Sequence, residues 1–405
     1  MKIGILAYQS AINFGANLQI ASTSGFLKQH GHEPVVINLV PDDLKDFFSS
    51  SLECQVSAHN SFMRQYCCLT ELCKNAKEVA KIILKEGIEA VIIGSDAVAQ
   101  HHPFLERLIF PTRRIFRVNK LTSDRMFPNP FWGTFSDYLP EGFPMAVMSA
   151  SNQDSSYRWM GFQTRKKMKE RLEKMRYISA RDNWTQSMYS YIFNNKRKFK
   201  ITPDPVFAFN QNVIEQPSEK EIRKKFDLKK DYILISFLRP DPLPQGWLPE
   251  FEKIANSENI ECVAFPFPSG IKFKNDLKRK IELPLSPIDW YCLIKYSKGY
   301  IGNNMHPIVV SLHNANPFFS FDNYGRYVNK YAVDDSTSKI KHILQEADLL
   351  DYRISTCNLK GELPTPQFIL SKLLNFEYDK TRSFSQKQYN AYDNMLKEIL
   401  DSFSN

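Results

Sequence analysis

The chain contains no uninterrupted apolar run of about 18 residues, the length that a bilayer-spanning helix needs. The opening residues, 1–8, turn polar too early for a signal peptide. Cysteine is scarce, at seven residues, and no two cysteines form a C-x-x-C pair. We therefore expect neither a metal site nor a disulfide framework, and a cytoplasmic location is predicted.

Nucleic-acid-binding patterns are also missing: there is no zinc-finger spacing, no leucine-zipper heptad and no RNA-binding aromatic signature. The net charge of +9 is still compatible with nucleic acid, an anionic membrane surface or an anionic small substrate. Composition does not choose among these partners, but the missing motifs weigh against nucleic acid.

What is present is typical of a soluble globular protein. The 405 residues are 43% hydrophobic and 24% charged, which suggests about two or three domains. Strand-like apolar runs at 3–8, 35–40, 90–96 and 145–150 alternate with helical stretches, and the pattern restarts at 232–238 after a Pro/Asp/Asn-rich linker at 202–217. Such alternation predicts parallel sheets with helices on both faces.

The predicted fold class is therefore α/β, with two Rossmann-like doubly wound domains facing a central cleft. We expect the first domain at 1–205, the second at 206–380 and a terminal helix at 381–405. The last helix carries one apolar stripe, Tyr389, Tyr392, Leu396, Ile399 and Phe403. This stripe needs a surface to cover, and the first domain is the expected one.

A long insertion at 101–132 interrupts the first domain and combines aromatic with basic residues. That composition suits a bilayer surface or a lipid-linked anionic substrate, and a solvated loop with a few hydrophobic anchors is the equally weighted alternative.

Ligands of parallel sheets bind beyond the carboxyl ends of the strands, and four such loops carry polar residues of interest. Asn13 precedes Gly15 in the first, without a dinucleotide G-x-G-x-x-G fingerprint. Asp96 ends the apolar run at 90–96, where it could accept a proton from a hydroxyl or simply cap the next turn. Arg181 could form a fork to a carboxylate or phosphate, or a structural ion pair.

The fourth loop is the most informative, because Asn304 and His306 precede Pro307 at the expected start of a helix. Helix amides there attract anions, and a histidine adds a group that carries a proton near neutral pH. A capping histidine with ordinary packing is the alternative reading.

At these loops the chain resembles the polysaccharide pyruvyl transferase family. The matching elements, in chain order, are Asn13-Phe14-Gly15-Ala16-Asn17-Leu18-Gln19, Gly94-Ser95-Asp96, Ser179-Ala180-Arg181-Asp182, Asp204-Pro205-Val206 and Asn303-Asn304-Met305-His306, followed by Asn316-Pro317-Phe318. The chain departs from the family pattern at Pro307, where the family has glycine, and at Ala97 and Ala99, where it has glutamine and tryptophan. An asparagine also replaces the acidic residue or arginine before the histidine.

The resemblance implies a two-domain, GT-B-like glycosyltransferase fold whose members transfer the enolpyruvyl group of phosphoenolpyruvate to two hydroxyls of a sugar. The product is a pyruvate ketal on a capsule, exopolysaccharide or cell-wall glycan. The implied partners are phosphoenolpyruvate, as co-substrate, and a glycan or polyprenyl-diphosphate-linked sugar, with peripheral contact at the cytoplasmic membrane face; no further cofactor is implied.

Residue by residue, the resemblance implies that His306 and Asp96 are catalytic, and that Asn13 and Asp96 face the acceptor in the first domain. Arg181 of the first domain would bind the donor together with Asn304 and His306 of the second. Arg239 and Arg326 are added to the donor site from their loop positions alone.

Two alternatives remain open: a glycosyltransferase of the same fold with a nucleotide-sugar donor, and a non-catalytic relative in a glycan assembly complex.

Overall fold

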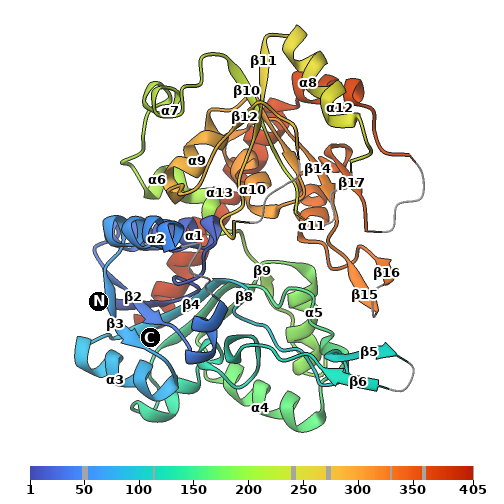
Figure 1. Ribbon diagram of the computed structural model, residues 1–405. Helices are drawn as coiled ribbons and strands as arrows, with labels where there is room; N and C mark the ends of the chain where they lie inside the picture. The colour runs from blue at the N-terminus through green and yellow to red at the C-terminus, as the bar shows by residue number, and fades with distance from the viewer. Residues whose placement is uncertain are drawn as a thin grey trace.

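Two parallel β-sheets organise the chain, one in each half of the molecule (Figure 1). The structure is a computed structural model that describes residues 1–47, 53–112, 115–238, 243–270, 275–328, 331–357 and 362–404. Within these residues, no helix combines the length and the apolarity that crossing a bilayer requires.

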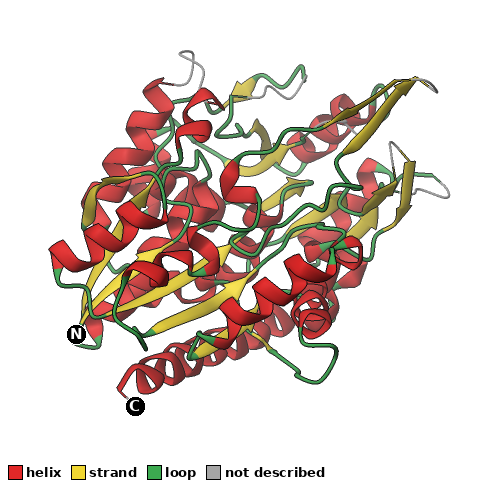
Figure 2. Cartoon of the chain, turned by 90° about the horizontal axis from the view of Figure 1, so that it is seen from below, coloured by secondary structure: helices red, strands yellow, loops and turns green. Residues whose placement is uncertain are grey.

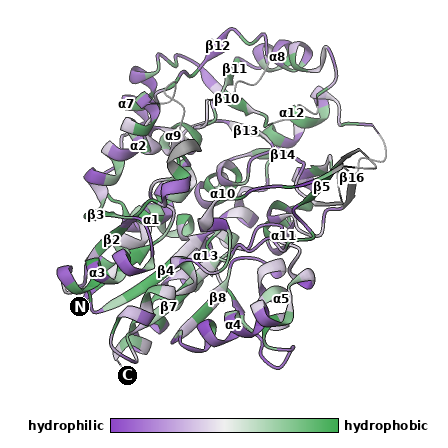
Figure 3. Ribbon diagram, turned by 60° about the horizontal axis from the view of Figure 1, so that its bottom comes forward, coloured by the Kyte–Doolittle hydropathy of each residue, from purple (hydrophilic) through white to green (hydrophobic). Residues whose placement is uncertain are grey.

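The first sheet has seven strands, in the order β3 (Leu69–Cys73), β2 (Glu33–Leu39), β1 (Lys2–Leu6), β4 (Ala90–Asp96), β7 (Met145–Ala150), β8 (Tyr177–Ala180) and β9 (Lys200–Ile201). Every residue of β4 and β7 is buried, as their apolar runs require. The helices around it are α1 (Phe14–Gln29), α2 (Glu53–Tyr66), α3 (Ala76–Glu86), α4 (Phe162–Glu173) and α5 (Asn183–Ile192). Figure 3 shows the contrast between the apolar strands and the polar face of α4.

The second sheet has six strands, in the order β12 (Arg279–Lys280), β11 (Ile260–Ala264), β10 (Asp231–Ser236), β13 (Gly299–Gly302), β14 (Phe318–Asp322) and β17 (Arg353–Ser355). Its helices are α7 (Glu219–Lys225), α8 (Trp247–Ser257), α9 (Pro287–Lys295), α10 (Met305–Asn314), α11 (Lys339–Glu346) and α12 (Pro366–Leu374). In both sheets the strand order reverses beside the first strand, so the predicted pair of doubly wound, Rossmann-like domains is confirmed.

The last helix, α13 (Tyr378–Ser404), begins on the second half and packs back on the first. Ser385 donates to the carbonyl of His313 in α10 at 2.9 Å, whereas Tyr392 lies 3.3 Å from the hydroxyl of Thr23 in α1. Arg176, beside the first sheet, donates to the carbonyl of Ser402 at 2.9 Å. The expected packing of this helix is therefore confirmed, and Figure 2 shows it running alongside the strands to the C-terminus.

The linker predicted at 202–217 joins the two sheets, but its first part is buried rather than exposed. Residues 202–209 are all buried, and they form a 3-10 helix at Pro205–Ala208 and the short helix α6 (Phe209–Asn212). Asp204 caps this turn by accepting from the amide of Val206 at 3.0 Å. In the sequence, the prolines and polar residues around Phe207 and Phe209 make this segment resemble an exposed linker. Both phenylalanines nevertheless insert between the two halves.

The insertion at 101–132 consists of an exposed hairpin and a following segment that leads back into the core of the first domain. Strands β5 (Leu108–Thr112) and β6 (Ile115–Val118) pair antiparallel, with Phe110 and Phe116 exposed. Phe131 and Trp132 instead join the core of the first domain. A second hairpin, β15 (Arg326–Val328) with β16 (Tyr331–Asp334), projects to the same side from the other half (Figure 1).

One apolar core continues from the first half into the second. Ile3 and Ile5 of β1 belong to the same buried cluster as Ile308 and Val309 of α10. Phe14 at the start of α1 stacks on Trp290 of α9, with ring centroids 5.1 Å apart. Because the interface between the halves is core rather than surface, their relative position is fixed by hydrophobic burial.

Candidate active site

A cavity of about 750 Å³ lies between the two domains, where the strand ends of both sheets meet. The first domain contributes Ile12, Asn13, Asp96, Gln153, Asp154 and Arg181; the second contributes Leu238, Phe267, Pro268, Ser269, Asn304, Met305, His306, Asn323, Tyr324, Gly325, Thr337 and Lys339. The predicted residues Asn13, Asp96, Arg181, Asn304 and His306 thus line one cavity. Its position at the topological switch points is where doubly wound sheets place their ligands.

His306 stands in the first turn of α10 and reaches across to the first domain. Its imidazole lies against the backbone of Gly15, where a Cβ would overlap the ring. Its Nε2 is buried without a hydrogen-bond partner among the described residues. Burial lowers the pKa of His306, helped by the positive charges of Arg181 and Lys339 and opposed by the carboxylates of Asp96 and Asp204. Burial thus favours the neutral imidazole over the imidazolium.

The motifs that carry the sequence resemblance converge on one buried hydrogen-bond chain. Arg181 donates from Nη2 to Oδ1 of Asp96 at 3.0 Å and from Nη1 to Oδ2 of Asp204 at 2.8 Å. Gln19 of α1 donates to the same oxygen of Asp204 at 2.7 Å. This chain of hydrogen bonds holds together four segments that lie far apart in the sequence, beneath the cavity.

Both terminal nitrogens of Arg181 are therefore engaged by carboxylates, and its side chain is only 4% exposed. Burial alone would raise the pKa of Asp96, but Arg181, His306 and Lys339 outweigh it and hold that pKa below its ordinary value. Asp96 is thus a fixed negative acceptor, in a left-handed backbone conformation (φ 75°) at the end of β4.

The asparagines of the site divide into structural and exposed ones. Asn13 caps α1, accepting from the amide of Gly15 at 3.1 Å, and its partly exposed side chain also lines the cavity. Asn303 is fully buried and bridges to the backbone of Leu238, with bonds of 2.7 and 3.0 Å. Asn304 is the N-cap of α10 but makes no side-chain cap bond, so its amide is available to a ligand.

Lys339 is the cation that the sequence reasoning missed. It opens α11 directly after the cap Ser338, whose hydroxyl is bonded to Asp322. A lysine in the first turn is disfavoured by the helix dipole, and this mismatch is the sequence signal that could have identified it. Burial lowers the pKa of Lys339, as does Arg181, against the carboxylates of Asp182, Asp96 and Asp154.

Two predicted donor arginines are not placed. Arg239 lies outside the described residues. Arg326 begins β15, directly after the cavity residue Gly325, and its side chain lies outside the described part of the structure. Two histidines that follow Asp96 in the chain are engaged within the first domain: His101 accepts from the amide of Phe127 at 3.2 Å, and His102 pairs with Glu106 at 2.9 Å.

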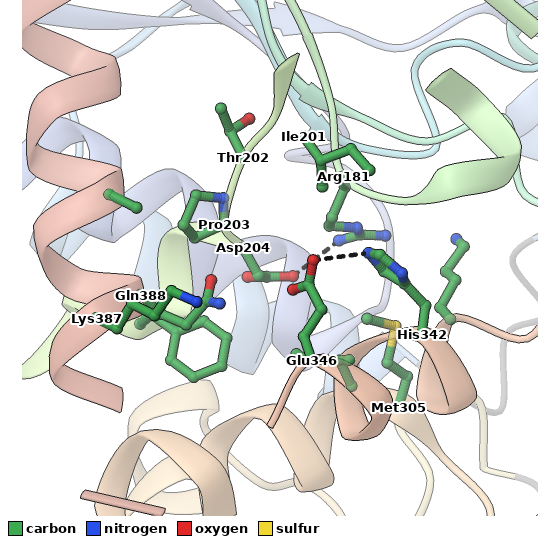
Figure 4. Close-up of a pocket in the computed structure, with 14 residues that line it drawn as sticks. Arg181, Ile201, Thr202, Pro203, Asp204, Met305, His342, Glu346, Lys387 and Gln388 are labelled. Atoms are coloured by element: carbon green, nitrogen blue, oxygen red, sulfur yellow. Dashed lines mark hydrogen bonds and ion pairs between the residues drawn. The ribbon is translucent and has the colours of Figure 1, made fainter. Parts of the chain in front are cut away.

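A smaller chamber of about 250 Å³ lies behind Arg181 and Met305 (Figure 4). Asp204 and Arg181 point toward each other on one wall, and His342 faces Glu346 on another, at 3.7 Å. Arg181, Met305 and Lys339 line both this chamber and the main cavity, so these three side chains separate the two spaces.

Chemically, the cleft combines cations and helix amides with an imidazole, and it places a carboxylate on the opposite side. Such a set holds an anion on the second-domain side and a hydroxyl on the first-domain side. Among the residues that the structure describes, no three His, Cys, Asp or Glu side chains cluster as a metal site would.

Solved structures with the same fold come from several bacteria. A UDP-N-acetylglucosamine 2-epimerase from Neisseria meningitidis bound to UDP-GlcNAc matches with a TM-score of 0.56 at 10% identity, over 100% of both chains. That from Rickettsia bellii gives 0.53 at 9% identity, over 100% of this chain and 96% of that chain. A putative one from Listeria monocytogenes gives 0.51 at 10%, over 98% and 94%. At these identities the likeness shows the fold, and it confirms the GT-B-like class.

Sequence comparison points to one family. The family profile described as Polysaccharide pyruvyl transferase matches residues 13–324, which include Asn13, Asp96, Arg181, Asn304 and His306. No curated protein matches the chain.

The contact between Gly15 and His306 predicts a specific non-additivity. Gly15→Ala places a methyl group in the space of the imidazole, so we expect a loss of about 1–3 kcal/mol in unfolding free energy, as for other overpacked sites. The double variant Gly15→Ala/His306→Ala removes the ring and should unfold at nearly the same temperature as His306→Ala alone.

Thermal unfolding by circular dichroism measures both effects. Gly161→Ala is the control for a clash, because a Cβ at Gly161, the N-cap of α4, meets no atom within 4 Å and should lower the unfolding temperature less than Gly15→Ala does. Equal, additive losses from Gly15→Ala in both backgrounds would contradict the contact.

Proposed function

The chain belongs to the polysaccharide pyruvyl transferase family, and from this premise we propose that it transfers the enolpyruvyl group of phosphoenolpyruvate to two hydroxyls of a sugar. The observation that carries the proposal is the unpartnered Nε2 of His306, at a cleft that also holds Lys339 and Arg181. The product is a pyruvate ketal on a glycan precursor for a capsule, exopolysaccharide or cell wall.

The second-domain side of the cleft fits the donor. Phosphoenolpyruvate carries a phosphate and a carboxylate, and Lys339 with the free amides at the start of α10 supplies matching positive charge. Asn304 donates a hydrogen bond to phosphoenolpyruvate from its side-chain amide, because that side chain makes no cap bond to α10. Arg181 contributes its positive charge from below the cavity. Because Asp96 and Asp204 hold its terminal nitrogens, we assign it to positioning these carboxylates and balancing their charge rather than to a bidentate bond with the donor.

The reaction needs one proton at the donor's methylene carbon and two new bonds at the neighbouring carbon. The two sugar oxygens bond to that carbon, its bond to the phosphate oxygen breaks, and phosphate leaves. Of the two hydroxyl protons, one ends on the methylene carbon, which becomes a methyl group, and the other on phosphate. We assign proton transfer to His306 and the orientation of the attacking hydroxyl to Asp96, whose lowered pKa makes it an acceptor of a hydrogen bond.

The lowered pKa of His306 fits this role. Donor binding brings negative charge beside His306, and that charge raises its pKa toward the range where it carries the proton. Asn13, at the other side of the cavity, is assigned to the acceptor.

The activity test is phosphate release from phosphoenolpyruvate in the presence of galactosyl or mannosaminyl glycosides. His306→Ala should lower turnover by about 100-fold or more, because general acid–base catalysis contributes 10²–10⁴-fold. His30→Ala is the control, since His30 lies exposed at the far end of α1. No phosphate release with any acceptor, together with no thermal shift by phosphoenolpyruvate, would refute the proposal.

The proton assignment predicts a pKa shift measurable by NMR. The His306 ring signal, identified by its loss in His306→Ala, should titrate below 6.5 without ligand, because burial disfavours the imidazolium. Saturating phosphoenolpyruvate should raise that pKa, because its negative charges favour the imidazolium. A pKa that stays unchanged or falls on donor binding would remove His306 from proton transfer.

The same fold supports one alternative donor. The Neisseria epimerase structure is bound to UDP-GlcNAc, so a nucleotide-sugar donor is the second candidate. A thermal shift with a uridine or cytidine nucleotide, and none with phosphoenolpyruvate, would favour it. Failure of both donors would favour a non-catalytic relative.

We further propose that the acceptor is lipid-linked and that hairpin β5–β6 touches the membrane surface. Phe104, Leu105, Phe110 and Phe116 are all more than half exposed, and the basic residues Arg107, Arg117 and Lys120 accompany them.

Cosedimentation with vesicles containing anionic lipid tests this contact. Phe110→Ser/Phe116→Ser should reduce vesicle binding several-fold, whereas Phe368→Ser, at an exposed phenylalanine of α12, should not. Equal binding by all three proteins would argue against the hairpin.

A further inference from the structure

A third pocket, of about 380 Å³, opens beside Asp96 on the first-domain side of the cleft. It shares Ile12, Asn13, Asp96, Gln153 and Ser269 with the main cavity, so the two spaces are adjoining. Its other walls are Tyr8, Ala11, Leu44, Ala97, Gln100, Thr122, Asp124 and Arg125. A ligand there would lie next to the donor without occupying the donor's space.

Asp124 is the unusual residue of this pocket. It is only 4% exposed, and its Oδ1 is buried without a hydrogen-bond partner among the described residues. A buried carboxylate oxygen without a partner is costly, so such groups in native proteins call for an explanation. A ligand hydroxyl donating to this carboxylate provides one.

The backbone that carries this carboxylate is held in place by hydrogen bonds of its loop. Asn129, itself 5% exposed, donates to the carbonyls of Asp124 at 2.7 Å, Met126 at 3.0 Å and Ser123 at 3.3 Å. Asp43 accepts from the amide and hydroxyl of Ser123 at 2.6 and 2.9 Å. The loop therefore presents Asp124 rigidly, which favours specific recognition over loose contact.

Neighbouring groups complete a hydroxyl-binding set. Arg125 is oriented through its Nε, which donates to Oε1 of Gln100 at 3.0 Å. The Tyr8 hydroxyl lies 3.4 Å from the carbonyl of Asp124, and its ring packs against Phe131 with centroids 4.7 Å apart. Carboxylate, guanidinium and phenol bind pairs of sugar hydroxyls, and the apolar Ile12 and Leu44 contact the faces of a ring.

Charge separates this pocket from the donor site. The donor side carries Lys339 and the amides of α10, whereas the walls here bring Asp96 and Asp124 against the single guanidinium of Arg125. A carboxylated or phosphorylated sugar would meet repulsion from Asp124. The pocket therefore suits a neutral, hydroxyl-rich ring.

We propose that Asp124 and Arg125 bind a neutral hexose or N-acetylhexosamine ring of the acceptor and determine its identity. This inference rests on the proposed function for the meaning of acceptor, but sugar binding in the pocket is measurable without turnover. Asp124 lies in the insertion at 101–132 and belongs to none of the motifs that carry the family resemblance. On this proposal, the insertion helps to determine which acceptor sugar the protein binds.

Saturation-transfer NMR with methyl galactoside, methyl glucoside and methyl N-acetylmannosaminide tests the pocket, with glucuronate as the anionic probe. We expect at least one neutral glycoside to bind, and Asp124→Asn to raise its Kd about 10- to 100-fold through the lost charged hydrogen bond. Asp137→Asn is the matched control, because Asp137 pairs with Arg171 on the surface, away from the pocket. Arg125→Lys should also weaken glycoside binding, and it replaces Asp124→Asn as the test variant if Asp124→Asn does not fold.

The outcomes are distinct. Unchanged binding in Asp124→Asn, no binding of any neutral glycoside to the unmodified protein, or glucuronate binding as tightly as the neutral sugars would overturn the inference. Asp124-dependent glycoside binding without any phosphoenolpyruvate turnover would keep the pocket and refute the proposed reaction. In an active enzyme, Asp124→Asn should raise the acceptor KM while the thermal shift by phosphoenolpyruvate stays unchanged.

Discussion

The apolar interface between the two halves is the constraint on which the site depends. Because Ile5 of the first sheet and Ile308 of α10 belong to one buried cluster, the halves are set against each other by core packing. This packing presses the His306 imidazole onto Gly15, which only a residue without a Cβ permits. A histidine from one domain thereby becomes part of the loop surface of the other, and the site exists only in the assembled molecule.

Beneath that contact, the buried chain from Gln19 through Asp204 and Arg181 to Asp96 holds the loops of the first domain. Buried ion pairs contribute little net stability, because the desolvation of each charge offsets their attraction. These ion pairs instead fix the positions of the loops. Removing one partner of a pair would leave an uncompensated charge in the wall of the cleft. The cations Arg181 and Lys339 and the carboxylate of Asp96 thus line one cavity.

Local sequence signals predicted the fold because strands such as 90–96 and 145–150 are mostly apolar, as their complete burial requires, and helices begin at recognisable caps. The same logic placed Asn13, Asp96, Arg181, Asn304 and His306 at strand ends, and the structure brings them to one cavity. It missed Lys339 and Asp124, since their roles arise from tertiary packing across long separations in sequence. The two prolines and the aspartate of 202–209 made this buried segment look like an exposed linker. The engagement of Arg181 by two carboxylates depends on partners that no local pattern reveals.

Helix α13 makes the polypeptide cross between the halves a second time, after the buried segment at 202–209. It is attached to α10 through Ser385 and to the first sheet through Arg176 and Ser402. Both crossings also lie in the shared buried core, through Phe207 and Phe209 of the first and Phe384 and Tyr392 of the second. A rotation of one half that a single linker would permit must therefore also break the buried contacts of the other crossing.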